Sequence, residues 1–403
     1  MTNRVGQCNA SPSGNAARWR HTLCAALLFG IAGCEEERGG LEGHALLIAE
    51  MENVIVHSLQ RHHVPGAAVG LVEEGKVVWA RGFGIADEAE GRTMNSDTMF
   101  NTSSLSKPVT ALGVMRLAEQ GKLDLDAPVS RYLKRWRLPA GDFDADAVTA
   151  RRILSHTAGL SMPSIPAFMP DATLPSVVDI LDGNYTDSEY AEAGTRVEIL
   201  YPPGEAFHYS GGGYILLGLL VEEITGVSFR DYMRSEVLTP LGMTSGRYGW
   251  DEAVAGRLAV PYRHSGKPAP VLRFPATAGS GLYTGVSELA TLVAALLTFN
   301  DEAGRGVVSA EGMKTMFEAV VLTGGGTRME LPAMGLGFFV SKYPKLISHI
   351  GGNLGWRSRF LALPESGQAI VVLTNSDRGS DFVNDVACAW VEHQLGAKVI
   401  EGC

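Results

Sequence analysis

Residues 100–107 read Phe-Asn-Thr-Ser-Ser-Leu-Ser-Lys, and they open the strongest helical pattern of the chain. Apolar residues then recur at helical spacing as far as Gly121, which predicts a helix over residues 104–121. Positions three apart share one face of a helix, so the hydroxyl of Ser104 and the amine of Lys107 can meet. The start of the helix adds backbone N–H groups that favour negative charge on oxygen. Serine also caps many helices, so only the surrounding sequence can show whether Ser104 is a nucleophile or a helix N-cap.

Strand patterns lie on both sides of this helix in the sequence. Ahead of it, residues 67–72 and 76–80 predict two strands joined by a Glu-Glu-Gly turn. Behind it, strands are predicted at residues 337–340, 346–350, 358–363 and 368–375, followed by a helix at 381–394. The fold class is therefore α+β, with an antiparallel sheet flanked by helices and an inserted all-helical region.

Helical and loop signals dominate the middle of the chain. Six prolines and few periodic apolar residues in 161–203 predict long loops with short helices. We expect a discontinuous α/β domain made of residues 44–120 and 251–403, which begins with an amphipathic helix. A mainly helical domain is expected at residues 121–250.

The composition limits the function. Hydrophobic residues make up 45% and charged residues 19%, which is typical of a globular enzyme. The formal charge of −10 argues against a nucleic-acid partner, because phosphate binding needs a basic surface. The sequence contains neither a Gly-x-Ser-x-Gly elbow nor a His-Glu-x-x-His zinc helix. The hydrolase folds and the metalloproteases that carry these motifs are excluded.

The first 33 residues differ from the rest. Three arginines and no acidic residue precede an apolar run at residues 23–32, which is too short to span a bilayer but fits the core of an export signal. The run ends Ile-Ala-Gly before Cys34, which resembles a bacterial lipobox; an ordinary signal peptide with a chance cysteine is the alternative. We expect a lipoprotein-type signal peptide at 1–33, lipid on Cys34, a linker at 34–43, and a periplasmic protein anchored to the membrane.

Cys8 and Cys24 leave with this leader and lipid occupies Cys34, so only Cys388 and Cys403 remain free, which excludes a cysteine-rich metal site. A disulfide between them is allowed in an exported protein. We expect instead that Cys388 is a small buried apolar residue.

The segment around Ser104 and Lys107, extended by Leu-Asp-Leu-Asp-Ala-Pro-Val at residues 123–129, resembles the serine β-lactamase and penicillin-binding-protein superfamily. The likeness is greatest to the branch of class C β-lactamases, D-Ala-D-Ala carboxypeptidases, D-aminopeptidases and family VIII carboxylesterases. Further similar blocks lie at residues 152–160, 202–214, 238–243 and 351–356. The resemblance implies a β-lactamase/transpeptidase-like fold in which Ser104 is the nucleophile.

The second motif of the family, Tyr-x-Asn, falls on Tyr209-Ser210-Gly211. By this resemblance Tyr209 exchanges the Ser104 proton while Lys107 supplies positive charge, since a nearby cation favours phenolate. Either Lys107 or Tyr209 is the formal base. Gly211 replaces the asparagine that meets the substrate amide in the family, so acylamino substrates lose a polar contact.

The third motif, Lys-Thr-Gly in β-lactamases, is similar to His349-Ile350-Gly351. We expect His349 to donate a hydrogen bond to substrate and to be partly charged near pH 7. Ile350 lacks the hydroxyl that threonine offers to a carboxylate. Gly351 allows a close approach of the ligand. The resemblance implies an oxyanion hole made by the N–H groups of Ser104 and Gly352.

Other candidate residues receive simpler interpretations. His156 is expected to be structural in a tight loop, and Asp124 and Asp126 to cap or end helices. Tyr190, Tyr201 and Trp356 are either cleft or core aromatic residues.

The expected function is hydrolysis of an ester, an amide or a β-lactam through an acyl-enzyme on Ser104, with no cofactor and no metal. An esterase-like hydrolase of small molecules is favoured by Gly211 and Ile350. The alternatives are a D-Ala-D-Ala carboxypeptidase or D-aminopeptidase, a weak class C-like β-lactamase, and a protein that binds or senses cell-wall fragments without turnover.

Overall fold

The main sheet is assembled from both ends of the chain, as the sequence predicts. The computed structural model describes residues 23–298, 306–324, 331–343 and 345–396, with side chains from residue 43 on. Within these residues nine antiparallel strands lie in the order β3-β2-β1-β12-β11-β10-β9-β8-β7. They are β1 Gly66–Glu73, β2 Lys76–Asp87, β3 Arg92–Thr93, β7 Val321–Leu322, β8 Ala333–Met334, β9 Phe339–Lys342, β10 Lys345–Asn353, β11 Trp356–Leu363 and β12 Gln368–Thr374.

Strands β1 and β12 join the two ends of the chain at the middle of this sheet. Their register pairs Ala67 with Thr374 and Val72 with Ala369, and every residue of β1 is buried. The predicted first hairpin and the β10-β11-β12 meander are confirmed. The strand predicted at 337–340 begins later, at Phe339, because Gly337 has a φ of 87° and belongs to a turn.

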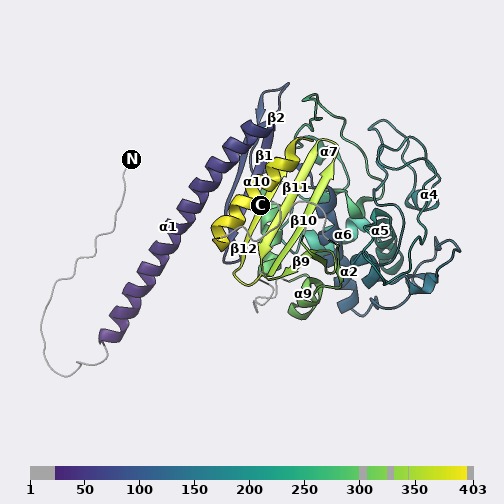
Figure 1. Ribbon diagram of the computed structural model, residues 1–403, viewed down its shortest axis with the longest axis horizontal. Helices are drawn as coiled ribbons and strands as arrows, with labels where there is room; N and C mark the ends of the chain where they lie inside the picture. The colour runs from purple at the N-terminus through teal and green to yellow at the C-terminus, as the bar shows by residue number, and fades with distance from the viewer. Residues whose placement is uncertain (1–22, 299–305, 325–330, 344, 397–403) are drawn as a thin grey trace, which may run out of the picture. The chain divides into compact units, whose positions relative to one another are not determined.

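Helices cover both faces of the sheet. Helix α8 packs on β1, β2 and β12, whereas α10 packs on β11 and β12. Alternate β12 residues such as Val371 join the main core cluster, while the intervening Val372 is buried outside that cluster. Since successive strand residues face opposite sides, both faces are apolar and covered. Figure 1 shows α10, in yellow, lying along β11 and β12.

The inserted region carries most of the remaining helices. Between residues 161 and 203 the structure has one α-helix, α4, so the predicted loops are confirmed. The region is not purely helical, because β5 Arg247–Tyr248 joins β6 Leu282–Thr284 and β4 Phe100–Asn101 in a small second sheet. The α-helices are α1 Leu23–His62, α2 Ser106–Glu119, α3 Ala150–Leu154, α4 Val177–Asp182, α5 Gly211–Thr225, α6 Phe229–Met233, α7 Glu252–Ala255, α8 Val286–Leu297, α9 Ala310–Phe317 and α10 Gly379–Leu395.

The chain divides into two compact units, Met1–Ala49 and Glu50–Cys403, and the second holds the sheet and the site described below. The predicted linker at 34–43 is helical and belongs to α1, since its Glu, Arg and Leu residues favour a helix. Residues 1–22 of the predicted leader lie outside the described residues.

Two further expectations concern the membrane and the cysteines. Among the described residues no single helix is both long and apolar enough to cross a bilayer; α5 and the segment Phe229–Leu238, bent by 84°, meet that test only as a pair. Cys388, on α10, is disulfide-bonded and only partly buried, so the expectation of a small buried apolar residue is wrong.

Candidate active site

Ser104 lies in a 3-10 turn immediately ahead of α2. The turn, Ser103–Leu105, was predicted as the first turn of the helix, which begins instead at Ser106. Ser103 has a φ of 54°, an uncommon conformation for a residue other than glycine. Its N–H donates to Asn101 Oδ1 at 3.0 Å, and its carbonyl accepts from Ser106 Oγ at 2.7 Å. These two bonds hold the strained residue and fix the direction of the neighbouring Ser104 side chain.

Lys107 is the amine that the structure brings to Ser104. Its side chain is 1% exposed, and Nζ donates to Ser104 Oγ at 3.1 Å and to the carbonyl of Gly279 at 2.9 Å. No ion pair joins Lys107 to a carboxylate in the part of the chain that the structure describes. A buried amine with this geometry can exchange a proton with the serine hydroxyl.

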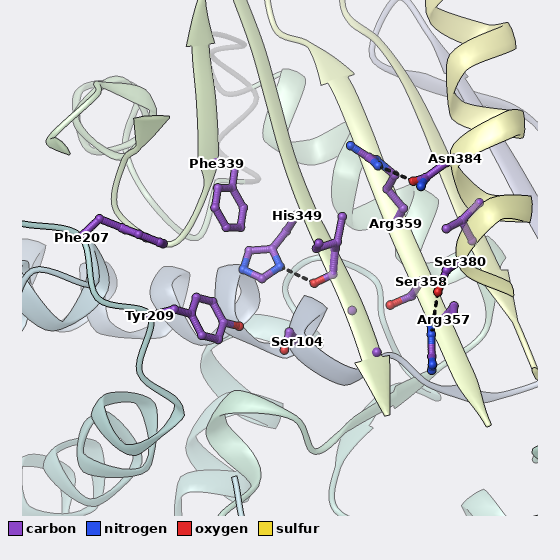
Figure 2. A pocket seen from close by; sticks show the side chains of 14 residues that line it. Ser104, Phe207, Tyr209, Phe339, His349, Arg357, Ser358, Arg359, Ser380 and Asn384 are labelled. Atoms are coloured by element: carbon purple, nitrogen blue, oxygen red, sulfur yellow. Dashed lines mark hydrogen bonds between the residues drawn. The ribbon is translucent and has the colours of Figure 1, made fainter. Parts of the chain in front are cut away.

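Tyr209 reaches the same point from the segment that leads into α5. The Lys107 Nζ atom lies 5.0 Å from the centre of the Tyr209 ring and 5.5 Å from that of Tyr214. Figure 2 shows the phenol oxygen of Tyr209 directed toward Ser104. The structure therefore brings together the three predicted catalytic side chains, from the 3-10 turn, from α2 and from the inserted region.

Strand β10 forms the opposite wall, and its close approach requires a glycine. A Cβ atom on Gly351 would lie 2.5 Å from the carbonyl oxygen of Thr102 and 2.3 Å from Ser358 Oγ. Ser358 Oγ itself donates to Thr102 O at 2.8 Å, which ties β11 to the chain just ahead of Ser104. Gly352, the next residue, lines the same cavities as Ser104. This placement is compatible with the predicted oxyanion hole of Ser104 and Gly352.

His349 differs from its expected state. It is 1% exposed, and burial together with the Lys107 charge lowers its pKa to about 3, so it is neutral near pH 7. Its Nδ1 lies 2.8 Å from the carbonyl of Ile350, and because a carbonyl can only accept, Nδ1 carries the proton. Nε2 is then an acceptor, and it is buried without a partner in the cavity wall. The expectation of a partly charged donor is wrong, because the sequence does not disclose the burial.

Two cavities meet at Ser104, Tyr209 and Gly352. The larger cavity, about 560 Å³, lies toward β10, β11 and α10 (Figure 2). The smaller cavity, about 300 Å³, lies toward the inserted region. The larger is lined by Ser104, Phe207, Tyr209, Phe339, His349, Ile350, Gly351, Gly352, Arg357, Ser358, Arg359, Ser380, Val383 and Asn384. The smaller is lined by Ser104, Lys107, Pro163, Ser164, Ile165, Tyr190, Tyr209, Ser280, Gly352 and Asn353.

Gly211 does not line either cavity, although the sequence suggested it as a substrate contact. A Cβ atom added there would lie 2.8 Å from Ile165 Cγ1 and 3.0 Å from the carbonyl of Pro163. The space that a larger side chain would occupy is therefore filled. The wall of the smaller cavity at this point is the apolar side chain of Ile165.

Several residues of the site were not found from the sequence. Gly279, which holds Lys107 through its carbonyl, ends the short 3-10 helix Thr277–Gly279, and Ile165 lies in an irregular segment; neither position carries a motif. Tyr190 lines the smaller cavity, whereas Trp356 is a core residue at 3% exposure. Among the described residues no group of three or more His, Cys, Asp or Glu side chains could hold a metal ion.

Comparison with known proteins places this geometry in a family. The family model described as Beta-lactamase matches residues 51–389. The chain is 32% identical to Esterase EstB of Burkholderia gladioli over 230 residues, which cover 56% of this chain and 57% of that protein. It is 26% identical to Protein flp of Staphylococcus aureus over 331 residues, covering 81% of this chain and 62% of flp. The chain thus spans about three fifths of the length of these curated relatives.

A solved structure agrees with this family assignment. An octameric penicillin-binding protein homologue from Pyrococcus abyssi superimposes with a TM-score of 0.70 at 25% identity, over 87% of this chain and 78% of that one. The expected fold class is confirmed by this likeness.

Proposed function

Because the chain belongs to the beta-lactamase family, we propose that it is a serine hydrolase that cleaves small carboxylic esters through an acyl-enzyme on Ser104. One observation carries this proposal. The Ser104 hydroxyl lies 3.1 Å from the buried Lys107 amine, at the point where two cavities meet. A nucleophile beside groups that can exchange its proton, with room on both sides for the two halves of a substrate, is the arrangement that acyl transfer requires.

The chemistry follows from the positions of the three side chains. Ser104 Oγ bonds to the ester carbonyl carbon while its proton passes to Lys107 or Tyr209. The N–H groups of Ser104 and Gly352 stabilise the negative oxygen. The C–O bond to the alcohol then breaks as the alcohol takes up that proton. A water molecule attacks the acyl-enzyme in the same way, which releases the carboxylic acid and restores Ser104.

Three features of the cavities favour esters over acylamino substrates and β-lactams. Ile165 fills the space beside Gly211, where the family's asparagine would offer an amide. Ile350 offers no hydroxyl, and His349 is neutral where β-lactamases carry a lysine. The name of the relative EstB, an esterase, agrees with this substrate class.

A second candidate is a peptidase that releases D-amino acids from cell-wall peptides. Arg357 and Arg359 are among the residues that line the larger cavity. Arg357 pairs with Asp377 at 3.1 Å and the buried Arg359 donates to Asn384 at 2.8 Å, so a substrate carboxylate would compete with these partners for the positive charge. In this second candidate function, Arg357 and Arg359 would recognise the carboxylate at the C-terminus of the peptide substrate.

A substrate panel on purified protein lacking residues 1–34 separates these functions. We expect rapid release of p-nitrophenol from p-nitrophenyl acetate and butyrate, and slow or no turnover of nitrocefin and of D-Ala-D-Ala peptides. The Ser104→Ala variant is the control and should be inactive. Faster turnover of the peptides would favour the peptidase, and of nitrocefin a β-lactamase. Binding of cell-wall fragments without any turnover would favour a sensor and contradict the proposed hydrolysis.

We also propose that the protein is an exported lipoprotein of the periplasm, with lipid on Cys34. The apolar run at residues 23–32 and the small residues before Cys34 support this localisation. Mass spectrometry of the N-terminal peptide from the membrane fraction should find a diacylglyceryl group on Cys34. A Cys34→Ser variant that stays in the membrane fraction to the same extent would contradict the proposal.

A further inference from the structure

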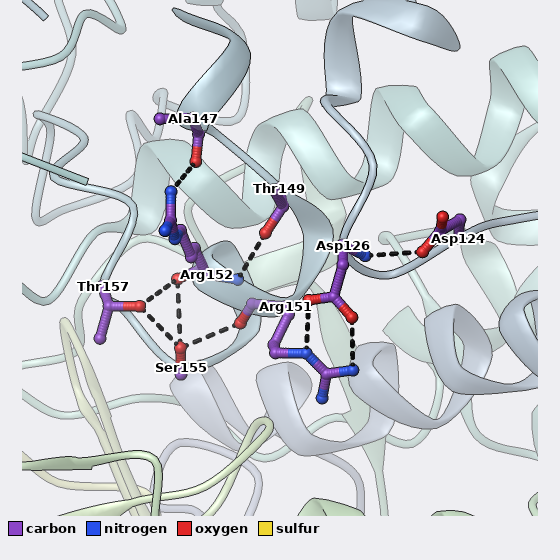
Figure 3. Close-up of polar contacts among 8 residues, drawn as sticks. All are labelled: Asp124, Asp126, Ala147, Thr149, Arg151, Arg152, Ser155 and Thr157. Atoms are coloured by element: carbon purple, nitrogen blue, oxygen red, sulfur yellow. Dashed lines mark hydrogen bonds and ion pairs between the residues drawn. The ribbon is translucent and has the colours of Figure 1, made fainter. Parts of the chain in front are cut away.

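His156 lies in a rigid loop that follows α3. Its φ of 55° is in the left-handed region, which residues other than glycine, asparagine and aspartate seldom adopt. The hydroxyls of its neighbours Ser155 and Thr157 lie 2.9 Å apart, and Ser155 Oγ donates to the carbonyl of Arg151 at 2.9 Å (Figure 3). Both neighbours are buried. The backbone N–H groups of Ser155, His156 and Thr157 also donate to the carbonyls of Arg151, Ile153 and Arg152 at 3.1, 3.1 and 2.8 Å. These backbone bonds, which do not depend on the hydroxyls, fix the loop and the direction of the histidine side chain.

The fixed histidine holds the segment that carries Tyr209. The N–H of His208 donates to the His156 carbonyl at 2.8 Å, and the N–H of Ser210 donates to His156 Nδ1 at 3.1 Å. The imidazole also stacks on the Tyr209 ring, with centroids 4.2 Å apart and planes 29° from parallel. One residue therefore binds the backbone on both sides of the phenol and covers the face of its ring.

The imidazole is neutral in this position. Burial, the Lys107 charge and His349 lower the pKa of His156 well below its usual value. Because Nδ1 accepts the Ser210 N–H, the proton is on Nε2, which is buried and has no hydrogen-bond partner. An unsatisfied N–H is costly, so the ring is held here by its packing and by its Nδ1 contact. The ring offers Tyr209 a flat surface to stack on and the neighbouring backbone one hydrogen-bond acceptor, and it adds no second positive charge near Lys107.

We propose that His156 is a positioning residue for acylation, which holds the Tyr209 phenol in the direction of Ser104 through the stacked ring and the two backbone contacts. The inference rests on the proposed function, because it gives Tyr209 a part in acyl transfer. Displacement of a general base by about 1 Å costs on the order of 100-fold in rate, so loss of the stack has a measurable effect.

Two variants of His156 separate the stack from the backbone contact. In His156→Asn the side-chain oxygen can replace Nδ1 as acceptor, and asparagine tolerates the left-handed conformation, but the ring that stacks on Tyr209 is lost. His156→Phe keeps a ring and loses the acceptor. Thr157→Val is the matched control, because it removes the hydroxyl contact of the same loop and leaves the stack in place.

The readout is the rate of labelling of Ser104 by a fluorophosphonate, which needs no knowledge of the natural substrate. We expect labelling of His156→Asn to be at least 10-fold slower than that of the wild type, with His156→Phe intermediate and Thr157→Val unchanged. In a Tyr209→Phe background His156→Asn should cause no further loss, because the phenol hydroxyl that it positions is already absent. Thermal melts of each variant report whether the fold is kept.

The possible outcomes distinguish this inference from the proposed function. If the wild type is labelled and His156→Asn slows labelling equally in both backgrounds, His156 is a structural residue and the inference fails. Labelling of His156→Asn at the wild-type rate has the same meaning. Wild-type protein that is not labelled at all overturns the proposed function and this inference together.

Discussion

Acidification is the perturbation that tests the buried state of His349 most directly. In the unfolded chain this histidine takes up a proton near pH 6.5, whereas in the folded protein its pKa is about 3. Between these values the unfolded state binds one more proton than the folded state, so stability falls as the pH falls. From pH 7 to pH 5 this linkage lowers the free energy of unfolding by about 2 kcal/mol. The whole free energy of unfolding of a typical domain is about 5–15 kcal/mol, so the loss is large.

Urea denaturation at pH 7, 6 and 5 measures this loss. His156 titrates in the same direction, so the wild type alone reports both groups. The His349→Asn variant isolates one of them, because asparagine cannot take up the proton but can still donate to the Ile350 carbonyl. Its stability should fall by about 2 kcal/mol less than that of the wild type over this range. Equal slopes for both proteins would refute a neutral, buried His349.

Four further predictions concern other positions. Ser104→Ala should abolish fluorophosphonate labelling, and Tyr209→Phe should slow acylation about 100-fold or more, as expected for a lost general base; an unchanged rate would exclude that role. Gly211→Asn should lower the free energy of unfolding by about 1–3 kcal/mol through overpacking, and Ile165→Ala in the same chain should recover part of it in chemical denaturation. The hydrogen bond from Arg151 lowers the pKa of Asp126, so the stabilisation by this pair is complete above the ordinary pKa of an aspartate, about 4, and is lost as the pH falls through the lowered value. In chemical denaturation Asp126→Asn should cost under about 1 kcal/mol at pH 7 and less in acid.

The elements with a strong local pattern were predictable. Apolar runs bounded by turn residues gave the hairpin of β1 and β2 and the meander that ends in β12. The spacing of Ser104 and Lys107, together with the family resemblance, predicted that the segments of Ser104 and Tyr209 meet. The structure has all three predicted catalytic side chains at one point.

The parts that depend on tertiary packing were not predictable. The neutral state of His349 follows from its burial and from the nearby charge of Lys107, which another element contributes. Ile165 occupies the space beside Gly211 from an irregular loop, and only the folded chain shows that this space is filled. His156 was expected to be a structural residue. Its two backbone contacts with the Tyr209 segment join residues about 50 positions apart, so the sequence alone does not show them.

The pairing of β1 with β12 has a consequence for how the protein is made. The two strands are separated by about 300 residues, so at the usual speed of translation β1 waits on the order of 15–60 s for its partner. During that time β1, which is apolar except for Glu73, presents an open edge to other chains. A circular permutant that connects the original termini and opens at the exposed Tyr343 would place β12 ahead of β1 and reduce their separation to about 95 residues. Such a permutant should give a higher yield of native protein in cell-free translation, because the aggregation-prone interval is shortened.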